Sequence, residues 1–487
     1  MKTKTRPVEK EKRILVTGAT GYVGGKLAKA LSGCPYRVRC LVRDPQKLPQ
    51  AVLDNAEVVQ GNVLEPNSVA VALEAVDTAF YLIHSMGAGG DFAERDRLAA
   101  NHFVQAAKSA GVKRIIYLGG LGDEQDLSAH LASRQEVGRI FAKSGITTLE
   151  FRASIIIGVG SISFEMIRTL VEKLPVMVTP RWVRTQAQPI AIEDVIGYLL
   201  EAIEVPLEKS RIFEIGGPER ISYKGLMVEY ARQRRLRRLM LPVPVLTPYL
   251  SSLWLKFVTP LYVRIGRALI EGIRNPTVVK DSSALTTFSV KPQTISEAMR
   301  RSLQAEDDEI EHFRGSKLYL KETIGYQKNT CRQGSRIIES YAVTVSTSPK
   351  RAFETIERIG GSNGWYYANW LWHLRGWIDR LAGGVGMRQT PRKQTPLKVG
   401  DHVDFWCVDA VETGRLLRLR AEMKLPGQAW LQFETEPRNG KTVICQTAIF
   451  KPHGLAGLMY WYGACPFHWF IFKGMIRAVA SRISTNH

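Results

Sequence analysis

The sequence predicts an α/β fold: a doubly wound parallel sheet, followed by a smaller α+β domain. Three observations predict it. From Arg13 onward, short apolar runs alternate with helical patterns, which is typical of a parallel sheet covered by helices on both faces. A glycine-rich turn joins the first apolar run to the first helical pattern. In the last third of the chain consecutive strands replace this alternation, and 487 residues exceed what one ordinary core requires.

The first domain is expected to span residues 12–300. Its expected strands are RILVTG, RVRCLVR, DTAFYLIHS, KRIIYLGG, TTLEFRASIIIG and RIFEIGG, separated by helices such as GGKLAKAL and RLAANHFVQAAKSAG. Prolines punctuate residues 235–300, which we interpret as a substrate lobe. Residues 301–334 are acidic and polar, and they are interpreted as a linker.

The second domain is expected to span residues 335–480. It begins with a strand and a helix, continues through a Trp-rich segment and several strands, and ends with the helix HWFIFKGMIRAVASRI. Antiparallel strands after an early helix, covered by a last helix, predict an α+β helix-grip layout. The uncharged run 454–472 is interpreted as last strand, turn and buried helix, because Pro466 and His468 argue against a membrane span.

Charge and cysteine content restrict the partners and the compartment. A net charge of +21 requires an acidic partner such as a cofactor phosphate, an anionic lipid or a nucleic acid. The dense basic cluster at 232–238 lacks an aromatic-rich nucleic-acid motif, so no specific nucleic-acid partner is expected. The six cysteines show no Cys-x-x-Cys pair, and the N-terminus lacks an apolar signal segment. A cytoplasmic location without a metal site is therefore expected.

The turn after the first strand carries the clearest functional signal. Gly18 permits a tight turn, Gly21 lets backbone approach a pyrophosphate, and Gly24 permits close packing of helix on strand. The helix N-terminus adds free N–H groups and a positive dipole. The loop predicts a dinucleotide site that also includes Thr20, Tyr22 and Val23.

The end of the second strand bears on the choice of dinucleotide. A ribose 2′-phosphate requires a guanidinium, whereas a free 2′-hydroxyl requires a carboxylate. Arg43 follows the strand directly, which favours NADP(H). Asp44 comes next and leaves NAD(H) as the alternative.

These residues resemble the short-chain dehydrogenase/reductase superfamily, in particular its atypical, NmrA-like and extended branches. The resemblance rests on TGATGYVG, QGNVLEP, YLIHSM, FRASIIIGVGS, IAIEDV and FEIGGPE. It implies a Rossmann fold, with Asn62 and Val63 beside the adenine and with Ile83 and His84 beside the nicotinamide ribose.

The catalytic signature of that superfamily is replaced in this chain. Active members use a Ser after the fifth strand and a Tyr-x-x-x-Lys set on the next helix, in which the phenol transfers a proton. Alignment places Gly119 or Gly120 at the Ser, His130 at the Tyr and Arg134 at the Lys. His130 is a candidate proton relay. Arg134 cannot deprotonate but is suited to hold a ribose or a phosphate.

The C-terminal segment resembles an uncharacterised domain family often fused to such reductase modules. Its order of elements is similar to that of START-like, polyketide-cyclase-type folds. Eight of the ten tryptophans lie in this segment. They are interpreted as the walls of a cavity for an apolar small molecule or lipid, or alternatively as core filling.

Two functions remain open from the sequence. The first is an NADP(H)-dependent oxidoreductase that acts on a hydrophobic carbonyl or enone. The alternative is a noncatalytic NADP(H)-binding sensor or assembly protein with a C-terminal domain for an apolar ligand. The basic cluster at 232–238 precedes the apolar run 239–263, which indicates peripheral contact with the inner face of a membrane. The oligomeric state is left open.

Overall fold

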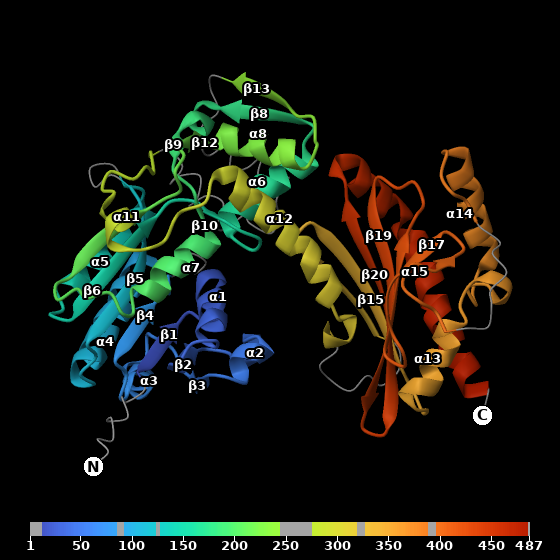
Figure 1. Cartoon of the computed structure of the whole chain (residues 1–487), viewed down its shortest axis with the longest axis horizontal. Coiled ribbons are helices and arrows are strands. Elements are labelled where there is room, and N and C mark those ends of the chain that lie inside the picture. The colour runs from blue at the N-terminus through green and yellow to red at the C-terminus, as the bar shows by residue number, and fades with distance from the viewer. Residues whose placement is uncertain are drawn as a thin grey trace, which may run out of the picture. The chain divides into compact units, whose positions relative to one another are not determined.

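The computed structural model describes residues 12–84, 92–122, 127–243, 275–318, 327–387 and 396–485. The chain divides into two compact units (Figure 1). Unit 1 comprises Met1–Leu170 and Val176–Leu303, and unit 2 comprises Val171–Pro175 and Gln304–His487. Each unit has a sheet and a hydrophobic core of its own.

Unit 1 contains a seven-stranded sheet in which every pairing is parallel, in the order β11-β6-β5-β4-β1-β2-β3. The strands are β1 (Arg13–Thr17), β2 (Arg37–Val42), β3 (Glu57–Gln60), β4 (Thr78–Tyr81), β5 (Arg114–Gly120), β6 (Thr147–Ala153) and β11 (Arg211–Ile215). The order reverses between β1 and β4, where folds of this kind bind their ligands. The predicted doubly wound parallel sheet is confirmed.

Helices cover both faces of this sheet (Figure 1). They are α1 (Tyr22–Leu31), α2 (Gln50–Leu53), α3 (Pro66–Leu73), α4 (Phe92–Ser109), α5 (Ala129–Ala142), α7 (Ile192–Glu201) and α11 (Ser283–Thr287). Two further helices, α6 (Ile162–Lys173) and α8 (Tyr223–Gln233), contact each other through the rings of Phe164 and Tyr230. Successive residues of β1 alternate between two cores: Ile14 and Val16 pack with α1 and α7, and Leu15 packs with α3 and α4. Burial on both faces explains why the strands are almost continuously apolar.

Short strand pairs lie outside the main sheet of unit 1. They are β7 (Ile156–Ile157) with β10 (Ile190–Ala191), β9 (Gln186–Ala187) with β12 (Ile221–Ser222), and β8 (Val176–Pro180) with β13 (Leu239–Val243). The 3-10 turns are η1 (Pro45–Lys47) and η2 (Arg181–Arg184). Much of the expected substrate lobe, residues 244–274, lies outside the described residues, together with most of the apolar run thought to contact a membrane.

Residues 301–334, interpreted as a linker, are largely helix and strand where the structure describes them. They contain the end of α12 (Ile295–His312), η4 (Gly315–Leu318) and β14 (Gln327–Gln333). The helix continues because it has buried side chains to pack: Ile310 lies in a small core, and the Glu306 carboxylate accepts hydrogen bonds from the backbone N–H and hydroxyl of Ser335. The polar composition of this segment did not indicate these buried contacts.

Unit 2 contains a seven-stranded antiparallel sheet in the order β14-β15-β20-β19-β18-β17-β16. Its further elements are β15 (Arg336–Val345), α13 (Pro349–Glu357), η5 (Gly361–Asn363), α14 (Asn369–Leu381), β16 (His402–Val403), β17 (Trp406–Glu412), β18 (Leu416–Ala421), β19 (Gly427–Arg438), β20 (Lys441–Pro452) and α15 (Gly454–Thr485). Side chains of α13, α14 and α15 share one core with the sheet. The expected α+β arrangement is present, and its START-like identity stays a prediction.

The end of the chain differs from the expectation. The run 454–472 forms neither a strand nor a turn, because α15 is one 32-residue helix with Pro466 inside it. Its buried residues Trp461, Phe472, Ile476 and Val479 recur at helical spacing and pack in the core of unit 2. No helix in the described part of the chain is both long and apolar enough to cross a bilayer.

The tryptophans of unit 2 divide into two groups. Five are buried: Trp365, Trp372, Trp406, Trp430 and Trp461. Three are exposed: Trp370, Trp377 and Trp469. On α14, Trp370, Leu374, Trp377 and Leu381 follow one another at helical spacing with exposed fractions of 65, 44, 60 and 70%. We call these four side chains the α14 apolar face.

Candidate functional site

The glycine loop of unit 1 is packed so tightly that two of its glycines have no room for a side chain. Gly18 adopts a left-handed φ of +72°, and a Cβ there would lie 2.6 Å from the carbonyl oxygen of Leu82. A Cβ on Gly24 would lie 2.2 Å from the carbonyl oxygen of Gly18. Helix α1 therefore rests directly on the turn that follows β1, as the motif predicts.

The start of α1 suits an anion. Gly21 is the N-cap residue, no side chain caps the helix, and its first turn has no acidic residue. The first backbone N–H groups are thus left for a ligand, and the helix dipole is uncompensated. Thr20 and Gly21 are exposed at the edge of the sheet where the strand order reverses. These residues fit the pyrophosphate of a dinucleotide.

Tyr22 and Val23, predicted to belong to the loop, are partly buried. The Tyr22 hydroxyl lies against Gly158, where a Cβ would be only 2.0 Å from it. Burial raises the pKa of Tyr22, and its hydroxyl has no hydrogen-bond partner among the described residues. Tyr22 thus explains a second glycine motif, the Gly158–Gly160 turn, and it faces protein rather than solvent.

Arg43 and Asp44 differ in how they are engaged. Arg43 is exposed after β2, and within the described residues its guanidinium forms no hydrogen bond or ion pair. The Asp44 carboxylate accepts the backbone N–H of Gln46 at 3.2 Å and pairs with Lys47 at 3.3 Å. The guanidinium of Arg43, rather than the carboxylate of Asp44, is therefore available to contact a ribose substituent.

The two residues predicted beside the adenine have different surroundings. The side-chain oxygen of Asn62 accepts the backbone N–H of Leu64 at 3.2 Å, and its backbone is held by Ser68. Val63 is 8% exposed and belongs to the core on the α3 and α4 face. Asn62 is therefore rigidly placed, while Val63 serves mainly as packing.

The structure brings two of the predicted histidines together. The rings of His84 and His130 lie edge to face with centroids 5.7 Å apart. Burial and the Arg134 guanidinium lower the pKa of His130 to about 3. Desolvation of its ring and the Arg134 guanidinium likewise lower the pKa of His84, to about 4. Ile83, beside His84, is partly buried. His130 is therefore neutral at pH 7.

Arg134 connects α5 to β5. One of its terminal nitrogens donates to the carbonyl of Leu118 at 2.7 Å, and its own carbonyl accepts from the Tyr117 hydroxyl at 2.9 Å. Its Nε is buried and has no hydrogen-bond partner among the described residues. Part of the guanidinium is thus used in a hydrogen bond that joins α5 to β5. A role for Arg134 in holding a ribose or phosphate stays a prediction.

A serine at position 119 or 120, where the resemblance to the superfamily would place one, requires a neighbouring side chain to move. A Cβ on Gly119 would lie 2.9 Å from Oε1 of Glu150, and a Cβ on Gly120 would lie 2.6 Å from a methyl carbon of Leu131. The hydroxyl-bearing side chain would have to displace these neighbours. Glycines at 119 and 120 therefore suit the packing around the end of β5.

A buried ion pair beneath this region was missed in the sequence. Glu150 and Arg152, both on β6, are joined at 2.8 Å with side chains only 3% and 8% exposed. Glu150 also fills the space over Gly138, where a Cβ would lie 2.2 Å from its carboxylate. The sequence signal that could have revealed this ion pair is the presence of two charged residues, two positions apart, in the strand TTLEFRA.

Unit 2 contains an apolar cavity of about 430 Å³ between α14, α15 and strands β17, β19 and β20. Its walls include Trp372, Trp406, Phe450 and Trp461. Three polar atoms in these walls are buried without a hydrogen-bond partner among the described residues, namely Nε1 of Trp372, Nε1 of Trp406 and Nδ1 of His468. Burial lowers the pKa of His468 to about 4, so this imidazole is neutral as well.

Comparison with protein families gives two matches. Residues 10–167 match the NmrA-like family. Residues 332–475 match a family described as protein of unknown function, DUF2867. The second match covers most of unit 2 and brings no chemistry with it.

Individual proteins resemble parts of the chain. A 3β-hydroxysteroid dehydrogenase/Δ5→4-isomerase of Mycobacterium tuberculosis is 32% identical over 115 residues, which are 22% of this chain and 30% of that protein. The photosystem II assembly factor Ycf39 of Trieres chinensis is 25% identical over 206 residues, or 42% and 63% of the two chains. The chain thus spans less than two thirds of each of these relatives.

A solved structure shares the fold of unit 1. Triphenylmethane reductase of Citrobacter sp. aligns with a TM-score of 0.51 and 17% identity over 60% of this chain and 99% of its own. This likeness shows the fold of unit 1 alone, and the match at residues 10–167 makes that part of the chain similar to the NmrA-like family.

Proposed function

We propose that the chain is an NADP(H)-dependent oxidoreductase that reduces a hydrophobic, conjugated carbonyl compound. The observation that carries the proposal is the uncapped N-terminus of α1, which rests on Gly18 at the point where the strand order reverses. Arg43 is left to pair with the 2′-phosphate. When bound, NADPH supplies the hydride.

The proposed substrate class follows from what the site lacks. His130 is neutral at pH 7, so it can donate a hydrogen bond through an N–H group but cannot act as an imidazolium acid. Neither Gly119 nor Gly120 supplies a hydroxyl. A simple ketone would leave a localised alkoxide without a proton donor, whereas an enone or quinone delocalises the charge until water delivers the proton. Conjugated acceptors are therefore favoured.

The test is NADPH oxidation with a panel of apolar enones, quinones and saturated ketones. We expect turnover with the conjugated compounds only. Because Arg43 pairs with the 2′-phosphate alone, Arg43→Ala should raise KM for NADPH by about tenfold, the worth of a charge-assisted contact, with KM for NADH unchanged. Lys47→Ala is the matched control, since Lys47 is paired with Asp44. Equal effects of Arg43→Ala on the two cofactors would contradict the assignment.

The same assay separates the enzyme from the sensor. His130→Phe should lower kcat/KM by more than about tenfold, and the rate should show no histidine titration between pH 5 and 8 because the pKa of His130 is about 3. Tight NADPH binding without turnover of any acceptor would favour the noncatalytic alternative, which the likeness to an assembly factor also supports. Absence of binding to either cofactor would overturn both.

We further propose that the cavity of unit 2 binds an apolar small molecule or lipid that carries a hydrogen-bond acceptor. Apolar walls suit a hydrocarbon body. Two buried indole N–H groups without a partner, those of Trp372 and Trp406, each carry a desolvation cost that an acceptor on the ligand would relieve. A carbonyl group is such an acceptor.

Trp372→Phe tests the polar part of this recognition, because it removes the N–H donor and keeps an aromatic wall. Binding of menadione should weaken about fivefold, the worth of one hydrogen bond, while methylnaphthalene should bind as before. Calorimetry measures both. Trp461→Phe is the control, since Trp461 lines the same cavity without a buried, unpartnered nitrogen. Equal weakening of both ligands by Trp372→Phe would leave only a packing role.

A further inference from the structure

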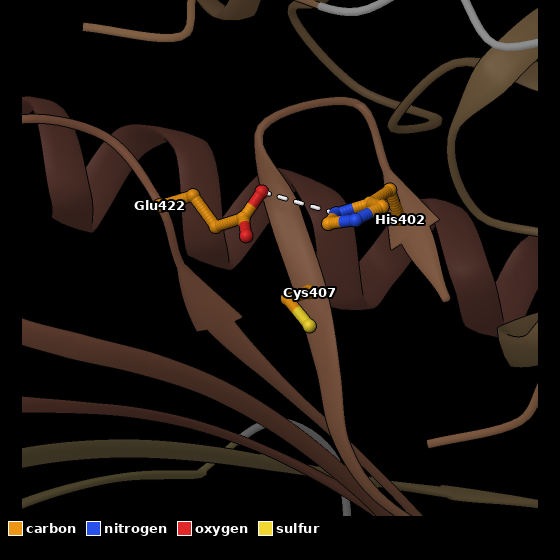
Figure 2. A group of neighbouring side chains, drawn as sticks. All are labelled: His402, Cys407 and Glu422. Atoms are coloured by element: carbon orange, nitrogen blue, oxygen red, sulfur yellow. Dashed lines mark ion pairs between the residues drawn. The ribbon is translucent and has the colours of Figure 1, made fainter. Parts of the chain in front are cut away.

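We propose that unit 2 carries a metal-binding site of the zinc class, formed by His402, Cys407 and Glu422 (Figure 2). An imidazole nitrogen, a thiol sulfur and a carboxylate oxygen all lie within 4.8 Å of one another. The cluster belongs to neither the dinucleotide loop nor the walls of the apolar cavity. No spacing motif in the sequence indicates these ligands, and a chain without a metal site was expected.

A tight hairpin places the first two ligands. His402 on β16 and Cys407 on β17 are paired in register, and only Asp404 and Phe405 separate the two strands. Asp404 adopts a left-handed φ of 57°, and its buried carboxylate accepts the indole N–H of Trp365 at 2.8 Å. The turn is therefore anchored in the core, which fixes the relative position of imidazole and thiol.

The third ligand is placed by the neighbouring strand. Glu422 directly follows β18, and its backbone N–H donates to the carbonyl of Phe405 in the same turn at 2.9 Å. Its carboxylate lies 3.1 Å from Nδ1 of His402. Figure 2 shows the Glu422 and His402 side chains extending toward each other, with Cys407 on the strand between them.

The donor set and spacing suit zinc. Zinc bonds of about 2.0–2.3 Å in a tetrahedron place neighbouring donor atoms roughly 3.3–3.8 Å apart. The His402 and Glu422 donors already approach this spacing, and the sulfur of Cys407 lies within 4.8 Å of both. Thiolate and imidazole select zinc and similar transition metals, whereas magnesium and calcium require oxygen ligands.

The coordination would be open on one side. The side chains of His402 and Glu422 are 43% and 24% exposed, whereas Cys407 is buried. Three protein ligands leave a fourth position for water, the arrangement of zinc sites that bind or activate a small molecule. A surface ion pair alone would account for His402 and Glu422 but not for the thiol that lies beside them.

Metal titration of the metal-free full chain tests the proposal. We expect one equivalent of Zn²⁺ to bind, and one equivalent of Co²⁺ to give the ultraviolet charge-transfer band of a cobalt–thiolate bond, which Zn²⁺ then removes. Mg²⁺ and Ca²⁺ should leave the spectrum unchanged. Failure of both Zn²⁺ and Co²⁺ to bind would overturn the proposal.

Variants assign the ligands. Cys407→Ser should abolish the charge-transfer band, and His402→Gln or Glu422→Gln should weaken Zn²⁺ binding by at least about tenfold. Cys331→Ser and His373→Gln are the matched controls and should bind like the parent chain. If Cys407→Ser fails to fold, the exposed His402→Gln decides the question. A thiolate band unaltered by Cys407→Ser, or unweakened binding in both His402→Gln and Glu422→Gln, would contradict the assigned site.

Discussion

Replacing Gly24 with alanine is expected to lower the affinity for NADPH by at least about tenfold and to destabilise unit 1 by about 1–3 kcal/mol, the usual cost of overpacking. The added Cβ would lie 2.2 Å from the carbonyl oxygen and 2.7 Å from the carbonyl carbon of Gly18. Gly18 has little space on its other side, because a Cβ built there would lie 2.6 Å from the carbonyl oxygen of Leu82. Either α1 or the phosphate-binding turn must move.

Calorimetric titration with NADPH and thermal unfolding measure the two effects. Gly33→Ala is the control at the other end of α1, where the nearest atom to an added Cβ is 3.7 Å away and the backbone is not left-handed. That variant should bind and unfold like the parent chain. Unchanged affinity in Gly24→Ala would mean that the loop does not contact the cofactor.

Replacing Glu150 with leucine is expected to lower the free energy of unfolding by about 3–5 kcal/mol, because it removes the carboxylate that pairs with a buried guanidinium. Arg152 is only 8% exposed and pairs with Glu150 at 2.8 Å. Adding Arg152→Met to Glu150→Leu should recover most of the loss, since an apolar pair of similar volume can replace a buried ion pair. Urea unfolding of the two variants gives the difference.

The pair formed by Arg97 and Glu136 supplies the control. It has a similar distance, 2.6 Å, but its side chains are 52% and 30% exposed. Glu136→Gln should therefore cost less than about 1 kcal/mol. Similar losses in Glu150→Leu and Glu136→Gln would show that burial does not amplify the Glu150 interaction.

The parts of the fold that were predictable depend on local patterns. The run RILVTG and the glycines after it determine a strand, a turn and a helix within twenty residues, so the parallel sheet and the loop were both visible. The helical course of the stretch QAEDDEIEH was not predicted, because its polarity outweighed Ile310, whose burial depends on distant strands. Likewise Pro466 suggested an interruption that α15 absorbs.

Candidate site residues could be predicted where a single sequence motif contains them. They could not be predicted where packing brings distant segments together. His130 and Arg134 were found by alignment, but the contact of His130 with His84 joins the end of β4 to α5. The hydrogen bond from the Arg134 guanidinium to the Leu118 carbonyl likewise depends on how α5 packs on β5. His402, Cys407 and Glu422 meet only through the register of adjacent hairpins, so no spacing rule reveals them.

The α14 apolar face has a consequence for the colloidal behaviour of the protein. Its four large side chains, 44–70% exposed, favour association with any apolar surface, including another copy. The net charge of +21 opposes self-association by repulsion. That repulsion reaches only about 8 Å at physiological ionic strength and shortens as salt is added. Raising the salt concentration therefore favours self-association through the α14 apolar face, and lowering it favours dispersed protein.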